Sequence, residues 1–490
     1  MTNLGTGAGA RSAAQESAAP SAAQHLPQAV QTQKLAARLK LTLDSDQLTN
    51  CMRCGFCQTA CPTFNETGLE AASPRGRIAL MKAVADGFME PDTRFKEQMD
   101  LCLGCRACEP ACPSDVKYGQ LIEQARESIA AETDYAPHVK AIRTLFMERL
   151  FPHHGRMRLL GGMLKLYQRS GMQKLARMSG VMRLLPEHMR QMEAILPEAS
   201  ADGVIRAWAK LGLPAAWETT NGSGGSRRML VIPPAGGATR ARVGLFRGCI
   251  MDVLFTSTNV NTVRLLREAG YEVVIPTSQT CCGALHAHAG ETASARRLAR
   301  ENLDAFGAAG VDFVASNAGG CGASLKEYDH LLHGDESAAD AARDFARKVR
   351  DVAELLVEHG RPLLPAPETT GAPLVVTYQD SCHLRNVMRV QQQPRTLLQS
   401  RPGVRLNELQ GADRCCGSAG IYNLTQPQMS ADVLDHKMEH VEQTEAEYVV
   451  TTNPGCLLQM KWGIERAGLG GRMKAVHLVD FMAEGLVRKS

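Results

Sequence analysis

Short apolar runs alternate with amphipathic stretches through the second half of the chain. Residues 258–269 carry apolar side chains at helical spacing, and Gly270 follows them as a helix stop. Strands that alternate with helices predict a parallel α/β sheet. The apolar runs are 243–246 (VGLF), 271–276 (YEVVIP), 311–316 (VDFVAS), 374–378 (LVVTY) and 447–452 (EYVVTT). We expect one such sheet in each of two successive segments.

The first quarter of the chain has a helical period instead. Residues 34–50, 73–89 and 117–132 each combine good helix formers with apolar positions on one side, and Pro74 marks a helix start. We expect helices here that wall off the loops between them.

The middle of the chain is helical, basic and rich in methionine. Residues 137–193 hold 11 Lys/Arg, 3 Asp/Glu and eight Met, in pieces broken at Gly171 and Pro186. Two interpretations fit this pattern: a face that meets a membrane or a partner, or a connector whose Met and Leu pack inward. We expect the second, and we expect subunit contacts here before any other region. Residues 221–241, rich in Gly, Ser and Pro, predict a flexible linker.

Composition narrows the class of protein. A net charge of +4 over 490 residues does not indicate nucleic-acid binding. No run of about 18 apolar residues predicts a membrane span, and the Ala/Ser-rich start, residues 1–33, predicts a disordered tail without a secretory signal. We therefore expect a cytoplasmic protein. In a reducing compartment, its 16 cysteines are expected to bind metal or to react, because disulfides are rare there.

Eight of the cysteines lie in two copies of one run. Residues 51–62 read CMRCGFCQTACP and residues 102–113 read CLGCRACEPACP, both C-x2-C-x2-C-x3-C-P, which is the bacterial ferredoxin spacing. Three thiolates on a tight loop reach one cluster, and the fourth reaches the other cluster. The predicted ligands are Cys51, Cys54, Cys57 and Cys112 for a first [4Fe-4S] cluster, and Cys102, Cys105, Cys108 and Cys61 for a second. Structural zinc is the alternative, but zinc sites typically use two separated C-x2-C pairs.

The other eight cysteines form a repeat. The first set is Cys249, Cys281, Cys282 and Cys321, and the second is Cys382, Cys415, Cys416 and Cys456. Their offsets are 133, 134, 134 and 135 residues, which indicates an internal duplication. Each set follows strand ends, where ligands bind in parallel sheets, so each half is expected to gather its four thiols at one edge.

Adjacent cysteines before a glycine can point both sulfurs at one site. Gly283 and Gly417 follow the two pairs and allow close backbone approach. Such a site suits a soft metal or an iron–sulfur cluster; a redox-active dithiol and an attacking thiol are the alternatives. The nearby His286, His288 and His383 could ligate iron, although a loop histidine without a metal role is more common.

Beyond the cysteines, the stretches PRGRIALMK (74–82), GCGASLKEY (320–328) and CCGSAGIYNLT (415–425), with HKM (436–438) after it, complete a resemblance. The chain resembles the iron–sulfur subunit of bacterial glycolate oxidase (glycolate dehydrogenase) from about residue 34 to residue 490. It is similar in layout to the C subunit of anaerobic glycerol-3-phosphate dehydrogenase, lactate-utilisation proteins and heterodisulfide reductase. One departure matters: in heterodisulfide reductase a C-x-x-C supplies a fifth cysteine, whereas Ala318 and Asn453 stand at those positions here. A noncubane cluster is therefore not expected.

The resemblance implies an electron carrier within a complex. It implies partners with FAD that oxidise glycolate to glyoxylate, a quinone-type acceptor, and peripheral association with the inner face of the cytoplasmic membrane. The sequence itself has no flavin or nicotinamide fingerprint in the required strand–turn–helix context, so we expect no flavin, no NAD and no catalytic residue on this chain. D-lactate or glycerol 3-phosphate complexes, and thiol or disulfide chemistry at the paired cysteines, are the alternative functions.

The predicted architecture is α + α/β. It comprises a tail (1–33), a helical ferredoxin-type domain with two [4Fe-4S] clusters (34–136), a basic helical connector and linker (137–242), and two duplicated cysteine-rich (CCG) domains (243–366 and 367–490). One or two further clusters in the CCG domains are an open alternative.

Overall fold

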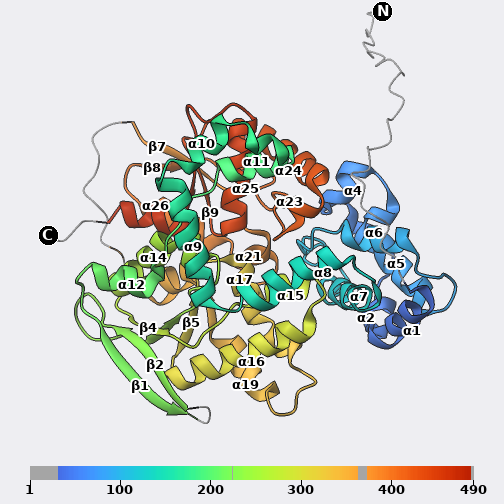
Figure 1. The fold of residues 1–490 in the computed structure, drawn as a ribbon, viewed down its shortest axis with the longest axis horizontal. Helices are drawn as coiled ribbons and strands as arrows, with labels where there is room; N and C mark the ends of the chain where they lie inside the picture. Colours follow the sequence, from blue (N-terminus) through green and yellow to red (C-terminus); the bar gives the residue numbers. More distant parts are fainter. Residues whose placement is uncertain (1–30, 223–224, 362, 364–371, 487–490) are drawn as a thin grey trace, which may run out of the picture.

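The computed structural model describes residues 31–222, 225–361, 363 and 372–486. Figure 1 shows a helical N-terminal part on one side of the molecule, and α/β halves on the other side. The predicted tail lies outside the described residues as far as residue 30, and the first helix begins at Thr32.

The ferredoxin-type part, residues 31–136, consists of short helices around two loops. Its elements are α1 Thr32–Thr42, α2 Ser45–Thr49, α3 Phe56–Thr59, α4 Pro62–Thr67, η1 Glu70–Ala72, α5 Pro74–Ala85, α6 Thr93–Asp100 and α7 Tyr118–Glu132. The three predicted helical segments are confirmed. In α5 the Ser73 hydroxyl accepts a hydrogen bond from Gly76 N at the helix start, and Pro74 occupies the first turn. Leu35, Met81 and Leu121 pack into the core of this part.

The connector, residues 137–215, is helical as predicted. Its elements are α8 Pro137–Arg143, η2 Thr144–Leu150, α9 His154–Arg169, α10 Met172–Met178, η3 Val181–Leu184, α11 Glu187–Ala194 and α12 Gly203–Lys210. Inward packing is confirmed for Met147 and Met157 but is wrong for most of the apolar residues, because Met178 is 75% exposed and Leu184 is 85% exposed. The connector therefore carries apolar side chains that the described residues leave exposed.

The predicted linker is wrong in one part. Strands β1 (Ala216–Gly222) and β2 (Gly225–Ile232) form an antiparallel hairpin, and β2 pairs with β4 (Glu272–Pro276) in the sheet of the first CCG half. The Gly/Ser-rich composition around the turn predicted a linker, but residues 225–232 form a strand whose last four residues, 229–232, are buried. Residues 223–224 at the turn are outside the described residues.

The first CCG half, residues 243–363, holds most of a six-stranded sheet in the order β1-β2-β4-β3-β5-β6. Strands β3, β4, β5 and β6 are parallel, as predicted. Besides β4, its elements are β3 Arg242–Leu245, α13 Met251–Leu254, α14 Thr256–Glu268, α15 Ala284–His288, α16 Thr292–Ala309, β5 Phe313–Ser316, α17 Gly319–Lys326, α18 Tyr328–Leu331, α19 Ala339–Lys348, β6 Val349–Asp351, α20 Val352–Glu354 and η4 Leu355–His359.

The second CCG half, residues 372–486, repeats the plan with a four-stranded parallel sheet in the order β10-β9-β7-β8. Its elements are β7 Leu374–Tyr378, α21 Cys382–Asn386, α22 Gln392–Ser400, β8 Val404–Leu406, α23 Tyr422–Thr425, α24 Pro427–Glu442, β9 Tyr448–Thr451, α25 Pro454–Arg466, β10 Lys474–His477 and α26 Leu478–Glu484.

The two halves share one hydrophobic core. Val273 of β4, Val376 of β7 and Phe481 of α26 belong to the same buried cluster. The His477 Nε2 lies 2.9 Å from the carbonyl oxygen of Asn317, and the Thr258 hydroxyl donates to Asp480 at 2.6 Å. This packing fixes the positions of the two cysteine sets relative to each other. Within the described ranges, no helix is long and apolar enough to cross a membrane.

Candidate iron–sulfur sites

The first ferredoxin set surrounds one pocket near the surface. Cys51, Cys54, Cys57 and Cys112 line a common pocket together with Arg75 and Tyr118, and Cys108 of the second set also borders it. Cys54 is exposed and the other three thiols are half-buried. The four predicted ligands of the first cluster thus face a common space, and the residues fit such a group.

The second ferredoxin set is buried. The side chains of Cys102 and Cys108 belong to the hydrophobic core of this part. Burial raises the pKa of the Cys108 thiol, and the nearby Cys102 and Cys61 add to this rise. Although burial opposes ionisation, Arg77 and Arg126 lower the pKa of the Cys102 thiol below its usual value. Gly104 N donates to the Cys102 sulfur at 3.4 Å, as does the Tyr118 hydroxyl at 3.5 Å. Buried cations and such hydrogen bonds suit an anionic cluster.

Cys105 departs from this set. Its buried side chain packs with Cys382 and Cys415 of the second CCG half, in a cluster that includes Leu103 and Tyr422. The structure therefore brings Cys61, Cys102 and Cys108 close to one another. The fourth predicted ligand of the second cluster, Cys105, packs against the second CCG half.

The four thiols of the first CCG half meet at the carboxyl edge of its sheet. Cys249 follows β3, the pair Cys281–Cys282 follows β4, and Cys321 lies in the first turn of α17 after β5. The Cys249 and Cys281 sulfurs are 3.7 Å apart. Hydrogen bonding to Cys281 and burial raise the pKa of Cys249. The prediction that strand ends gather this set holds in the geometry.

Backbone carbonyls of the first cysteine pair are held from behind. Asn302 Nδ2 donates to the Cys281 carbonyl at 3.0 Å, and the Tyr328 hydroxyl donates to the Cys282 carbonyl at 2.9 Å. These side chains come from α16 and α18, and both are buried. They fix the turn on which two adjacent sulfurs stand.

The second CCG half gathers its set in the same way. Cys382 begins α21, Cys415 and Cys416 follow β8, and Cys456 lies in the first turn of α25. Hydrogen bonds from the thiols of Cys105, Cys382 and Cys416 hold the pKa of Cys415 well below its usual range.

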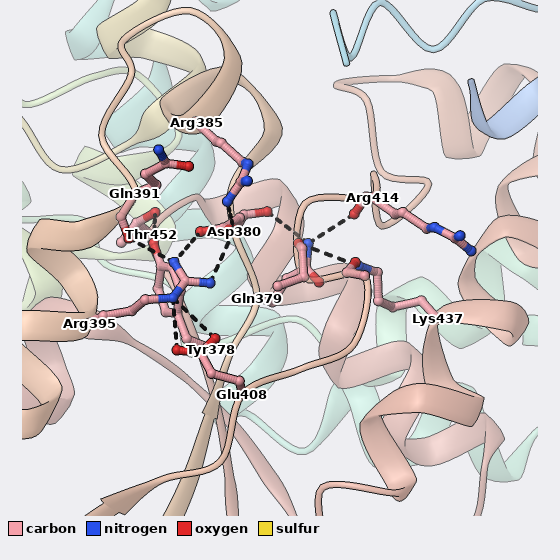
Figure 2. A network of polar contacts seen from close by, with 12 residues as sticks. Tyr378, Gln379, Asp380, Arg385, Gln391, Arg395, Glu408, Arg414, Lys437 and Thr452 are labelled. Atoms are coloured by element: carbon pink, nitrogen blue, oxygen red, sulfur yellow. Dashed lines mark hydrogen bonds and ion pairs between the residues drawn. The ribbon is translucent and has the colours of Figure 1, made fainter. Parts of the chain in front are cut away.

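A polar network braces this second site, as Figure 2 shows. Buried Asp380 accepts hydrogen bonds from Arg385 at 2.8 Å and from Arg395 at 2.9 Å. Gln379 Nε2 donates to the carbonyl of Arg414 at 3.2 Å. The network ties the end of β7, just before Cys382, to the residue just before Cys415.

Lys437 adds a buried positive charge beside the second pair. Burial lowers its pKa to about 8, against the opposing effect of the Cys416 and Cys415 thiols. Its Nζ donates to the Gly411 carbonyl at 2.6 Å. A cleft of about 1050 Å³ between α4 and α24 reaches both Lys437 and Cys415. The residue that stands 134 positions earlier, Leu303, is apolar, so the two halves differ here.

Glycine is required after both cysteine pairs. Gly283 has φ +86° and Gly417 has φ +88°, in the left-handed region that favours glycine. A Cβ at Gly417 would stand 2.5 Å from the Ser430 carbonyl oxygen, and one at Gly283 would stand 3.3 Å from the Ala295 Cα. The glycines let each pair turn directly against a neighbouring helix.

The three nearby histidines have other partners or settings. His286 Nε2 lies 2.7 Å from the Met147 carbonyl oxygen, and His288 Nδ1 lies 3.0 Å from Glu123. Burial lowers the pKa of His383 to about 3, so this ring is neutral, and its Nδ1 lies 3.6 Å from the Cys382 sulfur. Among the described residues, no three His, Cys, Asp or Glu side chains converge to hold a single metal ion. A cluster differs, because each thiolate binds its own iron.

Sequence reasoning missed Arg77 and Lys437 as charged groups beside the thiols. Arg77 is fully buried; its Nη2 donates to the Thr63 hydroxyl at 3.1 Å, and its Nε donates to the Gln98 carbonyl at 2.7 Å. Both residues lie in stretches that carry the family resemblance, 74–82 and 436–438, which was the only available signal.

Two thiol runs in a helical part, joined to two α/β halves with four thiols each, define an iron–sulfur protein that combines a ferredoxin-type and two CCG parts. Three family models match this chain. "4Fe-4S dicluster domain" matches residues 47–116, "Glycolate oxidase iron-sulfur subunit, linker region" matches residues 138–196, and "Cysteine-rich domain" matches residues 243–326 and 376–461.

Curated relatives agree over nearly the whole length. The "Probable glycolate oxidase iron-sulfur subunit" of Bacillus subtilis (strain 168) is 49% identical over 455 residues, which cover 92% of this chain and 97% of the relative. The "Glycolate oxidase iron-sulfur subunit" of Escherichia coli (strain K12) is 29% identical, with 91% and 96% covered. "Lactate utilization protein A" of Geobacillus kaustophilus is 32% identical, but it covers only 49% of this chain. The chain belongs to the family of glycolate oxidase iron–sulfur subunits.

Proposed function

We propose that this chain is the electron-transfer subunit of a glycolate dehydrogenase complex. A partner oxidises glycolate to glyoxylate, and the thiol-ligated centres of this chain carry the electrons toward a quinone-type acceptor. One observation carries the proposal: the thiol sets run from an exposed residue, Cys54, through a buried set to the cysteines of a second domain. Such a series of sites suits conduction.

The proposed cluster ligands are the eight ferredoxin cysteines. Cys51, Cys54, Cys57 and Cys112 would hold the first [4Fe-4S] cluster, and Cys102, Cys105, Cys108 and Cys61 would hold the second. When bound, these groups accept and release single electrons. The chain's own side chains tune them: Arg77 and Tyr118 stand at the buried second set, while the first set opens to solvent.

The CCG cysteines are proposed as further redox positions. Four contacting thiols at each sheet edge suit a cluster or a redox-active dithiol. The close approach of Cys249 and Cys281 is compatible with either. We assign no catalytic residue to this chain, since oxidation of a 2-hydroxy acid needs a hydride acceptor such as flavin, which we place on FAD-bearing partner subunits.

Peripheral membrane association is part of the proposal, and the connector supplies the surface. On α9, the exposed Leu159, Met163 and Leu166 share one face, and the following elements α10 and η3 carry further exposed apolar side chains. We call this the outer apolar face; its side chains are Leu159, Met163, Leu166, Met172, Leu175, Met178, Val181 and Leu184.

The charge around the outer apolar face favours anionic lipid. Residues 149–186 contain eight Lys/Arg and no Asp/Glu. Arg169 pairs with Glu198 and Arg177 with Glu193. Each basic side chain near an anionic bilayer contributes about 1 kcal/mol. Apolar side chains flanked by an excess of basic side chains are typical of interfacial helices.

Iron and acid-labile sulfide per chain test the electron-transfer proposal, on protein purified without oxygen. We expect about eight irons for two ferredoxin-type clusters and about twelve to sixteen if the CCG halves also hold them. In the full complex, glycolate should reduce these centres, as seen by EPR. Zinc in place of iron, or iron that glycolate never reduces in the complex, would refute the proposal. D-lactate in the same assay tests the alternative substrate.

Vesicle flotation tests the outer apolar face. The triple variant Leu159→Gln, Met163→Gln, Leu166→Gln should lose binding to phosphatidylglycerol vesicles, and the unmodified chain should not bind phosphatidylcholine vesicles. The control is Leu41→Gln with Phe88→Gln, because these two apolar side chains of the ferredoxin-type part are also exposed, at 87% and 86%. If the triple variant binds vesicles normally but fails to assemble with the partner subunits, the face is a protein interface instead.

A further inference from the structure

The ferredoxin-type part meets the two CCG halves in different ways. Its second loop, residues 101–108, lies on the second half. The Tyr422 hydroxyl donates to the Leu101 carbonyl at 2.8 Å, and Asn386 Nδ2 donates to the Cys105 carbonyl at 2.9 Å. Tyr422 and Asn386 are buried. Two hydrogen bonds therefore fix the backbone at both ends of the segment that carries Cys102 and Cys105.

The thiols continue this contact. Cys105, Cys415 and Cys382 pack in one buried cluster, together with Leu103 and Val433. The Cys105 thiol lies close enough to the Cys415 thiol that each shifts the pKa of the other. This buried contact places a thiol of the second ferredoxin set directly against the second CCG set.

The first CCG half is attached by other groups. Arg106 forms an ion pair with Glu327, His288 contacts Glu123 at 3.0 Å, and Gly290 packs against the Arg126 carbonyl. Its cysteines Cys249, Cys281 and Cys282 pack with their own half and with residues of the second half, and no ferredoxin cysteine shares that cluster. Within the described residues, the thiol contact between domains exists on one side only.

We propose that the second CCG site, and not the first, exchanges electrons directly with the second ferredoxin site, through the contact of Cys105 with Cys415. Each transfer moves one electron from the donor centre to the acceptor centre and breaks no bond. The inference rests on the proposed function, since it orders the centres of that same path.

Serine substitutions at equivalent positions of the repeat test which CCG site exchanges electrons with the second ferredoxin site. Cys415→Ser and Cys281→Ser are compared in the full chain, purified without oxygen, by EPR-monitored redox titration. Cys415→Ser should shift the midpoint potential of the buried ferredoxin centre and change the shape of its EPR signal, because the side chain that packs against Cys105 is replaced. Cys281→Ser should leave both unchanged. Equal effects from the two variants, or none from either, would overturn the inference.

Tyrosine variants cover the case in which loss of a thiol disturbs folding. Tyr422→Phe removes only the hydroxyl that holds Leu101, and Tyr328→Phe removes the hydroxyl that holds Cys282. Tyr422→Phe alone should alter the EPR signal of the buried ferredoxin centre, and an equal response from Tyr328→Phe would count against the junction. A chain with no ferredoxin EPR signal at all would refute the proposed function, whereas intact signals indifferent to Cys415 and Tyr422 would refute only this inference.

Discussion

At the scale of single residues, Arg77 is the group with the largest expected effect on the clusters. Its buried guanidinium stands beside Tyr118, Cys102 and Cys61; burial opposes its charge, but interaction with these groups raises the pKa of Arg77 overall. A fixed positive charge favours the reduced, more negative state of a nearby cluster. Arg77→Met is therefore expected to lower the midpoint potential of the buried ferredoxin centre, and Arg77→Lys should preserve most of it.

Redox titration followed by EPR checks the Arg77 prediction. Arg75→Met is the matched control, because Arg75 is a neighbouring arginine that pairs with Glu70 at the exposed first set. A lower potential for both ferredoxin centres in Arg77→Met would indicate a general loosening of this part instead of a local charge effect.

Gly417 carries the second residue-scale prediction. An alanine here combines strain at φ +88° with a Cβ 2.5 Å from the Ser430 carbonyl oxygen, and strained positions of this kind cost about 1–3 kcal/mol. Gly417→Ala should lower the apparent melting temperature and release the iron or thiols of the second CCG site. Gly68→Ala is the control, with φ +65° and no atom within 4 Å of the added Cβ. Similar losses in the two variants would contradict the steric argument.

The sequence predicted the candidate cluster ligands but not the charged groups beside them. Sixteen cysteines sort by spacing alone, because cluster loops and duplications impose fixed intervals. Arg77 and Lys437 have no such interval. Their charges face the thiols only because helices α5 and α24 present them to the interior, which depends on tertiary packing.

At the scale of elements, the residue that begins α20 lowers the stability of the fold as the pH rises. The side chain of buried Asp351 accepts a hydrogen bond from Ala353 N at 2.8 Å. The Asp351 backbone N–H donates in return to the Glu354 carboxylate, which completes a capping box. Burial raises its pKa to about 8, the Ala353 amide opposes the shift and Glu354 adds to it. In the unfolded chain an Asp titrates near about 3.9.

The sign follows from these two pKa values. Below about pH 4 the carboxyl is protonated in both states, so it adds no cost; as the pH rises toward 8 the unfolded chain releases its proton and the folded chain keeps it, so stability falls. Asp351→Asn keeps the cap without the charge and should raise the apparent melting temperature at pH 8 more than at pH 5.5. Exposed Asp340→Asn serves as control. An equal gain at both pH values would contradict the argument.

Element types followed the sequence closely, and the hairpin β1–β2 shows where local patterns fail. Strands β4, β5, β7 and β9 lie within the predicted apolar runs, and β3 begins one residue before its run. Residues 225–232 begin with Gly, Ser and two Arg, a polar composition typical of a linker, and pairing with β1 and β4 makes them a strand. Such a strand depends on its partners, which the local sequence does not reveal.

At the scale of the whole molecule, Arg106 joins the ferredoxin-type part to the first CCG half. It forms ion pairs with Glu109, which is 8% exposed, and with Glu327. Removing one partner of a buried ion pair typically costs about 3–5 kcal/mol. Arg106→Gln should separate thermal unfolding into two transitions, measured by calorimetry, with the ferredoxin-type part unfolding first. Exposed Arg343→Gln should leave one transition, and a single transition in both variants would argue against this coupling.

The arrangement of the domains is the part that sequence reasoning did not reach. Tyr422 bonds to Leu101 across 321 positions and Arg106 to Glu327 across 221. Such contacts have no local signature, because each partner would look like an ordinary polar residue of its own element. The duplication predicted two similar halves, and it gave no indication that only one would touch the ferredoxin thiols.

The exposure of Cys54 has a consequence for life in air. Of the eight ferredoxin thiols it is the one described as exposed, while the four of the second set are buried, and oxidative attack follows exposure. We therefore expect oxygen to destroy the exposed first centre before the buried second centre. In the proposed path electrons enter at this exposed centre, so the entry point is also the centre that oxygen damages first.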